Sequence, residues 1–455
     1  MENENGKFNS RLESVRRFLH SDLYTLCFII LCGVFIFTDK GVLGVVLLAL
    51  VCTVTMVLTD DLLPAFEGMM LISCFAIRLK YSTGEFLKLW PFIFPIAICF
   101  FSHFFIYHRK LKNFGILRGM IAASFALVLG GVGVINPRTY FSPTSIFYMI
   151  SLGFGMVIIC CYVADSFESK KDYDFEDKFC KMMVSTVIVI TLCLIYEYLS
   201  RRNELADHLH VIPFQWRNNG STLLMLAMPF VFYYSRKHFI FYILGILVYG
   251  EILLTGSRGG LIFGAAELFI CIAVMIILDK KHRKAEIITI IICVFALIVS
   301  RKYFFDLIQY TIDRMLNPEE ANTRIELYRR GIADFKFNPV NGRGIAYMGN
   351  RDVHPSAEHT LCWYHNSILQ VAASMGIIGI AAYVYLNILR IKVFLNNVSF
   401  FSLTMFLSFI GLEMMSLVNP GIFAPFPYLM LVSIYFIVIE KQNKNGRNVL
   451  KRSSK

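Results

Sequence analysis

Residues 259–278 read GGLIFGAAELFICIAVMIIL, an apolar run that begins directly after Arg258. A helix of about 20 such residues, rising about 1.5 Å per residue, crosses the roughly 30 Å hydrocarbon core of a bilayer. Beyond the run lies a basic cluster at Lys280, Lys281, Arg283 and Lys284. Short loops rich in Lys and Arg stay on the cytoplasmic side. We therefore predict a membrane-spanning helix with Arg258 at its outer end.

Similar apolar runs recur along the chain of 455 residues, of which 56% are hydrophobic and only 17% charged. Soluble domains are about 25% charged, so this composition excludes a soluble enzyme, a disordered chain and a secreted disulfide scaffold. It predicts an all-α polytopic membrane bundle of about 12–14 transmembrane helices. The candidate spans are 22–38, 41–58, 66–79, 89–107, 114–134, 144–163, 180–199, 221–234, 238–254, 259–278, 285–300, 366–389, 398–418 and 426–439. Three of these are short for a span, namely 66–79, 221–234 and 426–439.

The basic residues predict the orientation. The N-terminal tail carries Lys7, Arg11, Arg16 and Arg17, which places it inside. An even number of spans then makes both termini cytoplasmic. We attribute most of the net charge of +12 to the cytoplasmic loops and not to nucleic-acid binding. The predicted parts are a cytoplasmic tail (1–21), transmembrane helices (22–300) with an outer loop (200–220), a large extracytoplasmic loop (301–364), C-terminal transmembrane helices (365–439) and a basic cytoplasmic tail (440–455).

The large extracytoplasmic loop (301–364) is predicted to contain an amphipathic helix. Ile325, Tyr328, Ile332 and Phe335 recur at helical spacing, with basic residues at other positions. Such a helix lies on the outer membrane surface. Asn338-Pro339 should end it, because the residue before proline disfavours helical backbone. The loop glycines Gly342 and Gly344 then allow a tight turn.

Three polar side chains at predicted outer helix ends are candidates for chemistry. A guanidinium at Arg258 or Arg217 suits bidentate binding of phosphate, and a neutral imidazole at His365 accepts a proton near pH 7. Structural alternatives exist for each: a helix–helix turn with a snorkelling Arg258, an interfacial Arg217 beside a Trp anchor, and a hydrogen-bonded helix cap at His365. All three side chains are predicted on the same face of the membrane, which favours the interpretation that they form one functional site.

Acidic and other polar residues complete this survey. Three glutamates near outer helix ends, Glu197, Glu251 and Glu413, are candidate partners of the arginines. The set His354, His359, His365, Asp352 and Glu358 has no helical His pair, so we predict no metal site. The chain has no Gly-rich nucleotide loop after a strand, so we predict no nucleotide cofactor and no cofactor of any other kind.

Three stretches together resemble the superfamily of O-antigen ligases and O-antigen polymerases, which are bacterial membrane glycosyltransferases. They are TGSRGG at Thr255–Gly260, TRIELYRRGIADFKFNPVNGRG at Thr323–Gly344 and HNSILQVAASMGIIG at His365–Gly379. The middle stretch is similar to the family's Asn-Pro-x-x-Gly-x-Gly loop, and the last is similar to its His-Asn-x-x-Leu followed by Gly-x-x-Gly. The resemblance covers roughly residues 200–390, and the first 200 residues match only as hydrophobic helices.

The resemblance implies a glycosyltransferase that takes its glycan from undecaprenyl diphosphate, inverts the transferred sugar and uses no metal. Arg258, Arg217 and His365 fall where the family keeps its functional Arg, Arg and His. The residues around Arg217 depart from the usual Asn-Pro-Asn pattern. We assign His365 and Arg258 as catalytic, and Arg217 and Arg258 as ligands of the diphosphate. Because they are positive and lie in the outer loop, Arg324 and Arg343 are added as further diphosphate ligands.

Three functions remain open from the sequence. A polysaccharide polymerase of the O-antigen or capsule type is favoured, because polymerases in this superfamily serve diverse polymers. A ligase that attaches glycan to a lipid A core or another anchor shares the motifs. A non-catalytic transporter or flippase is the third. The predicted partners are a lipid-linked donor, a glycan acceptor and membrane lipids, with a chain-length regulator as a further candidate. The predicted location is the bacterial cytoplasmic membrane, with the active site on its outer face.

Overall fold

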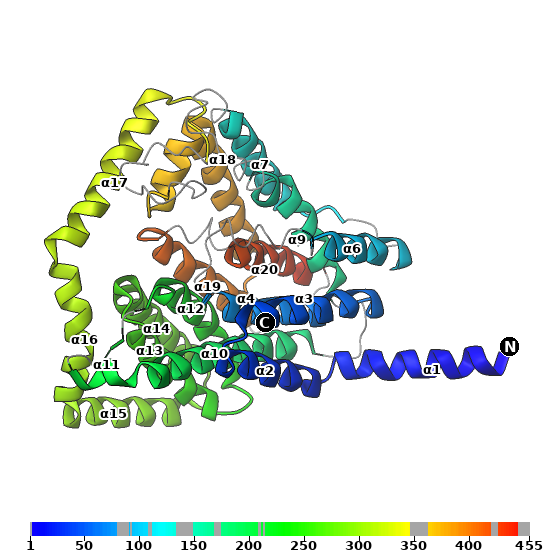
Figure 1. The fold of residues 1–455 in the computed structure, drawn as a ribbon, viewed down its shortest axis with the longest axis horizontal. Coiled ribbons are helices and arrows are strands. Elements are labelled where there is room, and N and C mark those ends of the chain that lie inside the picture. The colour runs from blue at the N-terminus through cyan, green and yellow to red at the C-terminus, as the bar shows by residue number, and fades with distance from the viewer. Residues whose placement is uncertain are drawn as a thin grey trace, which may run out of the picture. The chain divides into compact units, whose positions relative to one another are not determined.

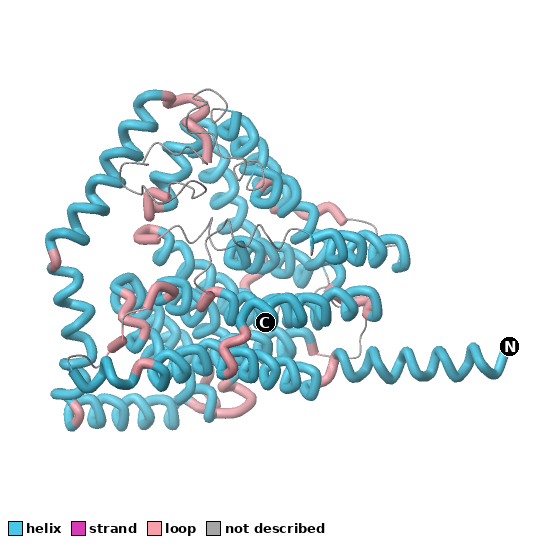
Figure 2. Tube along the Cα trace, in the orientation of Figure 1, coloured by secondary structure: helices cyan, strands magenta, loops and turns pink. Residues whose placement is uncertain are grey.

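The computed structural model describes residues 2–79, 91, 93–107, 112–132, 149–167, 174–207, 211–212, 214–345, 363–419 and 426–444. These residues form helices joined by loops, and no strand occurs among them (Figures 1 and 2). Each predicted span overlaps a helix. The all-α polytopic class is therefore confirmed.

The chain divides into two compact units, which we describe separately. Unit 1 comprises residues 1–111 and 163–204, and unit 2 comprises residues 112–162 and 205–455. The helices of unit 1 are α1 (Glu2–Leu19), α2 (Asp22–Phe37), α3 (Gly41–Leu58), α4 (Leu63–Ala76), α6 (Ile93–Tyr107) and α10 (Phe175–Ser200), and α11 (Arg202–Asp207) begins at its end.

Unit 1 is built around α10, which packs against α2 and α4. The helix starts at Asp174, whose carboxylate accepts the Glu176 backbone N–H at 3.1 Å and so caps a group that has no partner within the helix. One turn further, Lys178 and Lys181 bind Asp22 at 2.9 and 2.6 Å, which fixes the start of α2 beside the start of α10. These contacts set the mutual register of the two helices.

Unit 2 contains the remaining helices. They are α7 (Leu117–Val132), α9 (Phe154–Ser166, whose last residues cross into unit 1), α12 (Arg217–Tyr234), α13 (Ile240–Leu254), α14 (Arg258–Leu278), α15 (Arg283–Val299), α16 (Arg301–Leu316), α17 (Pro318–Phe337), α18 (Ser367–Asn396), α19 (Phe400–Ser416) and α20 (Phe426–Lys444).

The centre of unit 2 is α12, which packs against α13, α14 and α19. Nearly all of its side chains from Gly220 onward are buried. Ser408 on α19 donates to the Leu226 carbonyl of α12 at 2.7 Å and also contacts the Tyr435 hydroxyl of α20. The sequence marked this segment only as a short span. Because neighbouring helices and not lipid surround α12, it does not need an apolar surface as long as the hydrocarbon core is thick.

A second close packing joins α7 to α18. A Cβ added at Gly119 would lie 2.9 Å from the Leu386 Cα, and one added at Gly130 would lie 2.7 Å from the Ser374 carbonyl oxygen. Small residues at such crossings let helix backbones approach within a membrane, where packing replaces the hydrophobic effect. The two glycines therefore hold α18 in the position from which its N-terminal half reaches the candidate site.

The number of spans differs from the prediction. Within the described residues, four helices are long and apolar enough to cross a membrane, and the bent pairs α1–α2 and α15–α16 raise this to six. Six further apolar helices have only 10–17 residues. At about 1.5 Å per residue such helices are shorter than the hydrocarbon core. Apolar composition therefore predicted the positions of the helices, while fewer of the described helices have the length and hydropathy of a complete span.

The predicted amphipathic helix is present as α17, and it ends at Phe337, directly before Asn338-Pro339. It follows α16, which leaves α15 at an angle of 81°, and the two helices succeed one another between α15 and α18 (Figure 1). The predicted apolar positions Ile325 and Ile332 are 46% and 47% exposed. On the opposite side of α17, Leu327 is buried, and a Cβ added at Gly331 would lie 2.7 Å from Leu369 of α18.

Candidate functional site

The TGSRGG stretch forms the turn between α13 and α14. Gly256 adopts a φ of 63°, a left-handed conformation that favours glycine. The Ser257 hydroxyl then accepts the Gly260 backbone N–H at 3.2 Å and caps α14. Arg258 is the first residue of the helix. Its guanidinium therefore belongs to the end of α14 where the helix dipole is positive.

The same turn is joined to the start of α12. Ser257 donates its hydroxyl hydrogen to the Asn218 Oδ1 at 2.9 Å, and Asn218 follows Arg217, the first residue of α12. Two helix N-termini, each beginning with an arginine, are thus linked directly. Both arginines are half-buried. Tyr428 at the start of α20 adds a hydrogen bond to the Asn219 carbonyl at 2.8 Å.

A third arginine reaches this cluster from the end of α16. The Arg258 Nη1 donates to the Arg314 carbonyl at 3.2 Å, and the Arg314 Nη1 donates to the Gly256 carbonyl at 3.3 Å. The two arginines therefore tie the end of α16 to the turn before α14. Arg314 was not predicted from the sequence as a site residue. The only signal for it was its place in the last turn of a helix, among the arginines of the outer loop.

His365 approaches the same region through the end of α19. A Cβ at Gly259 would lie 2.9 Å from Val418 and 3.0 Å from Met415, so the start of α14 touches the end of α19. On α18, Asn366 donates to the Leu417 carbonyl at 3.1 Å. His365 directly precedes this N-cap residue. The structure thus places the starts of α14 and α18 against one helix end, and so brings Arg217, Arg258 and His365 into one region.

The other predicted site residues lie in the middle one of the three family-like stretches, Thr323–Gly344. Gly342 and Gly344 have φ values of 71° and 93° in the loop after α17. Arg343 forms an ion pair with Asp334 at 3.3 Å and lies over the Phe337 ring at 4.1 Å. Arg324 is half-buried on α17. Gly342, Arg343 and Gly344 belong to the α17–α18 contact, since Arg343 and Gly344 donate to the Ala373 and Ser374 carbonyls of α18.

The loop 338–345 docks into a break in α18. Gly376 has a φ of 61° and interrupts the helix. The Ile377 and Ile378 backbone N–H groups bond to the Pro339 and Val340 carbonyls at 2.8 and 3.2 Å. A break leaves helix N–H groups without their usual partners, and the loop supplies the acceptors. Gly342 in the loop 338–345 and Gly376 in α18 therefore both lie where this loop crosses the helix.

Asp334 is the buried acid of this region. It is 1% exposed and accepts the Tyr364 hydroxyl at 2.6 Å. Burial raises the pKa of Asp334, while the hydrogen bond from Tyr364 and the charges of Arg330 and Arg343 act in the opposite direction. Asp334 was not predicted from the sequence, because nothing in the spacing of the chain links it to Tyr364.

Two of the glutamates considered as partners of the site arginines pair elsewhere. Glu197 lies 3.5 Å from Arg78, and Glu413 lies 3.5 Å from Arg390. The second pair joins α18 to α19, so neither glutamate is established as a partner of Arg217 or Arg258.

No group of three or more metal-ligating side chains occurs among the residues that the structure describes. The histidines and acids weighed as metal ligands, His354, His359, Asp352 and Glu358, lie outside the described residues. The described part of the candidate site is built from arginine, histidine and helix N-termini, which suit an anion.

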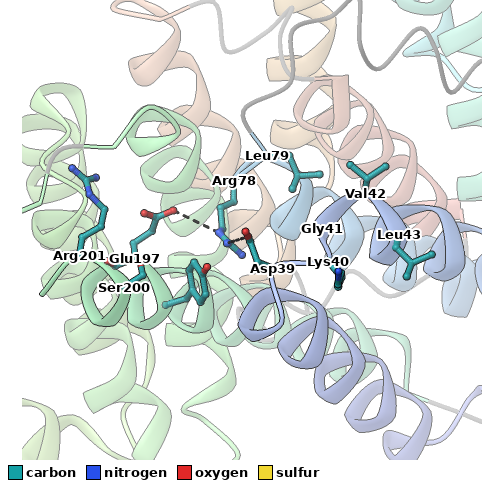
Figure 3. Close-up of a pocket in the computed structure, with 11 residues that line it drawn as sticks. Asp39, Lys40, Gly41, Val42, Leu43, Arg78, Leu79, Glu197, Ser200 and Arg201 are labelled. Atoms are coloured by element: carbon teal, nitrogen blue, oxygen red, sulfur yellow. Dashed lines mark hydrogen bonds and ion pairs between the residues drawn. The ribbon is translucent and has the colours of Figure 1, made fainter.

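Unit 1 has a cavity of about 680 Å³ of its own, lined by Asp39, Lys40, Arg78 and Glu197 among others. The Arg78 side chain, 7% exposed, binds Asp39 at 2.9 Å and Glu197 at 3.5 Å (Figure 3). It also lies 3.8 Å from the centre of the Tyr196 ring. Arg78 thus braces the ends of α2, α4 and α10.

We expect Arg78→Met to destabilise unit 1, because it leaves the largely buried Glu197 carboxylate without its cation. Removing one partner of a fully buried pair costs about 3–5 kcal/mol, and the exposure of Asp39 reduces this to about 2 kcal/mol. Thermal unfolding of the purified protein measures the effect. Arg201→Met is the matched control, because the Arg201–Glu204 pair is largely exposed. Equal melting temperatures for both variants would contradict a stabilising role of Arg78 in unit 1.

The fold and site define an α-helical, multi-pass membrane protein with a cationic cluster at adjoining helix ends. Residues 242–384, which include that cluster's turn and the start of α18, match the family model described as O-antigen ligase. This match supports the resemblance of the chain to the superfamily of O-antigen ligases and polymerases, whose members are glycosyltransferase-like proteins of the bacterial inner membrane that act on lipid-linked glycans. A comparison with curated proteins finds no match.

Proposed function

We propose that this protein is a surface polysaccharide polymerase that transfers a glycan from undecaprenyl diphosphate to a sugar hydroxyl of a second lipid-linked chain. The observation that carries the proposal is the direct link between the starts of α12 and α14, made by Ser257 and Asn218 at 2.9 Å. It gathers Arg217 and Arg258 at two helix N-termini. The match to the O-antigen ligase family supports the lipid-linked donor.

The arginine cluster suits a diphosphate for physical reasons. Helix N-termini present unpaired N–H groups and the positive end of the helix dipole, which together favour phosphate. A guanidinium adds two parallel charge-assisted hydrogen bonds. Departure of the diphosphate builds negative charge on its bridging oxygen, and preorganised cations in a low-dielectric cleft stabilise that charge. Arg324 and Arg343 remain predicted ligands of the diphosphate, although Arg343 already pairs with Asp334.

In the proposed reaction, His365 takes the proton of the acceptor hydroxyl. The hydroxyl oxygen attacks the anomeric carbon on the face opposite the diphosphate. The bond from that carbon to the phosphate oxygen breaks, and its electron pair leaves with the diphosphate. The new glycosidic bond therefore has inverted configuration. Arg258 and Arg217 stabilise the leaving group, so the scheme assigns no step to a metal.

Reconstitution of the purified protein in lipid vesicles tests the function. The substrate is a lipid diphosphate-linked oligosaccharide, supplied alone or with a lipid A core acceptor, and the products are sized by gel electrophoresis and mass spectrometry. We expect longer lipid-linked chains from the donor alone. Transfer only to the added core would favour the ligase. Absence of transfer to any acceptor would contradict the enzyme and favour the transporter or flippase.

Chelation should leave the transfer rate unchanged. The proposed site neutralises the diphosphate with arginines, whose charge does not depend on a metal. The measurement compares initial rates with and without excess EDTA. Loss of activity that returns when Mg²⁺ or Mn²⁺ is added would contradict the metal-independent scheme.

A further inference from the structure

Asp334 joins three parts of the chain at one buried carboxylate. Its partners are the Tyr364 hydroxyl at 2.6 Å, Arg343 at 3.3 Å and Arg330 at 3.6 Å. Arg330 lies one turn earlier on α17, Arg343 lies in the loop 338–345, and Tyr364 lies before α18. A carboxylate is costly to bury unless it is paired and hydrogen-bonded. The position of Asp334 is therefore coupled to all three segments.

Tyr364 is held at both ends. Its ring is 3% exposed and packs on Leu369 and Ala373, while its hydroxyl binds Asp334. Its backbone N–H donates to the Gln370 Oε1 at 3.0 Å, and the Gln370 amide donates to Ser374. The backbone that enters His365 is thus attached to both α17 and α18.

His365 itself has a φ of 51°, an uncommon conformation for a residue with a Cβ. Such a backbone costs about 1–3 kcal/mol and persists where its surroundings over-determine it. Asn366 fixes the following side, because its side chain accepts the Leu369 N–H at 2.9 Å and donates to the Leu417 carbonyl. Tyr364 fixes the preceding side. Both neighbours therefore restrain the backbone at His365.

We infer that Asp334 is a positioning residue, which through Tyr364 holds the backbone of His365 in the conformation that the transfer reaction requires. This inference rests on the proposed function, in which His365 is the general base. Asp334 does not touch the substrate. The same carboxylate binds Arg343, whose backbone N–H donates to the Ala373 carbonyl at 2.9 Å. Asp334 thereby fixes the loop 338–345 and the start of α18 together.

The test uses Asp334→Asn and Tyr364→Phe in the full-length protein, with kinetics in the vesicle assay. Small misplacement of a catalytic group costs up to about 100-fold in rate. We expect kcat to fall about 10–100-fold in both variants, with the KM for the donor within about twofold of wild type in Tyr364→Phe, which leaves the Asp334–Arg343 pair in place. Tyr364→Phe removes only the hydroxyl, so it tests the link if Asp334→Asn folds poorly. Unchanged kcat in a folded Tyr364→Phe protein would overturn the inference.

Two matched controls separate positioning from general damage. Glu326→Gln changes an exposed acid on α17, and Tyr303→Phe removes an exposed hydroxyl on α16. Both should leave kcat and the melting temperature unchanged. A merely structural role for Asp334 predicts that activity falls only in proportion to the folded fraction, so that kcat per folded molecule equals that of wild type, and that result would also overturn the inference.

A measurement without substrate distinguishes failure of this inference from failure of the proposed function. Hydrogen exchange read by mass spectrometry reports the backbone of residues 363–372. We expect faster exchange there in Asp334→Asn and Tyr364→Phe than in wild type or either control. Unchanged exchange would overturn the coupling even in an active enzyme. If the wild-type protein showed no transfer activity but exchange at residues 363–372 were faster in the two variants, the polymerase would be refuted. The coupling of Asp334 to the His365 backbone would still hold.

Discussion

Replacement of His365 by alanine is expected to lower kcat for glycan transfer by about 10²–10⁴-fold, the range that general acid–base catalysis supplies. The physical reason is that the acceptor hydroxyl is a weak nucleophile until its proton is removed. The donor KM should change little, because His365 acts on the acceptor and not on the diphosphate. Initial rates over a range of donor concentrations in reconstituted vesicles provide the measurement.

The matched control is His238→Ala, which removes an exposed histidine at the opposite end of α12 from Arg217. Its kinetics should equal those of wild type. If His365→Ala retained the wild-type kcat in folded protein, the general-base role would be wrong, and the α18 start would serve only to cap the helix.

Substitution of Arg258 should also produce a large loss. Arg258→Ala is expected to lower kcat about 10²–10³-fold, the cost of removing one preorganised donor from developing negative charge. Arg258→Lys should recover only part of this loss, because an ammonium keeps the charge but cannot form the two parallel bonds of a guanidinium. Rates for wild type and both variants, with inorganic diphosphate as a competing anion, provide the measurement.

Arg236→Lys is the matched control for the lysine variant. Arg236 is exposed at the far end of α12, where it lies over the Tyr233 and Phe400 rings. The Nη1 of Arg258 also binds the Arg314 carbonyl, so melting temperatures must accompany the rates. Full activity in folded Arg258→Lys would count against bidentate diphosphate binding.

The sequence predicted most of the fold at the level of single helices. The run 259–278 became α14 (Arg258–Leu278), and the spacing of Ile325 and Ile332 became α17. Both signals are local, because hydropathy and a 3.6-residue period act within one helix. The helix bounds were predicted less well: α12 begins at Arg217, four residues before the predicted span 221–234, because its first turn is polar and hydropathy does not register it.

The candidate site could be predicted only as a set of separate residues. Arg217, Arg258 and His365 were singled out by the charges and motifs around them, and the structure brings their helix ends into one region. Arg314 and Asp334 were missed. Each is defined by its partner, and those partners lie far along the chain: 56 residues separate Arg258 from Arg314, and 30 separate Asp334 from Tyr364.

Local runs of residues are enough to make this chain a helical membrane protein and to give it the motifs of a lipid-linked glycan transferase. Only the tertiary structure decides which helix ends contact one another. Ser257 finds Asn218, and the loop before Ile345 inserts at the Gly376 break, through single hydrogen bonds and close backbone contacts. Inside a membrane, packing and such bonds direct helix association in place of the hydrophobic effect, and no periodicity in the sequence records them.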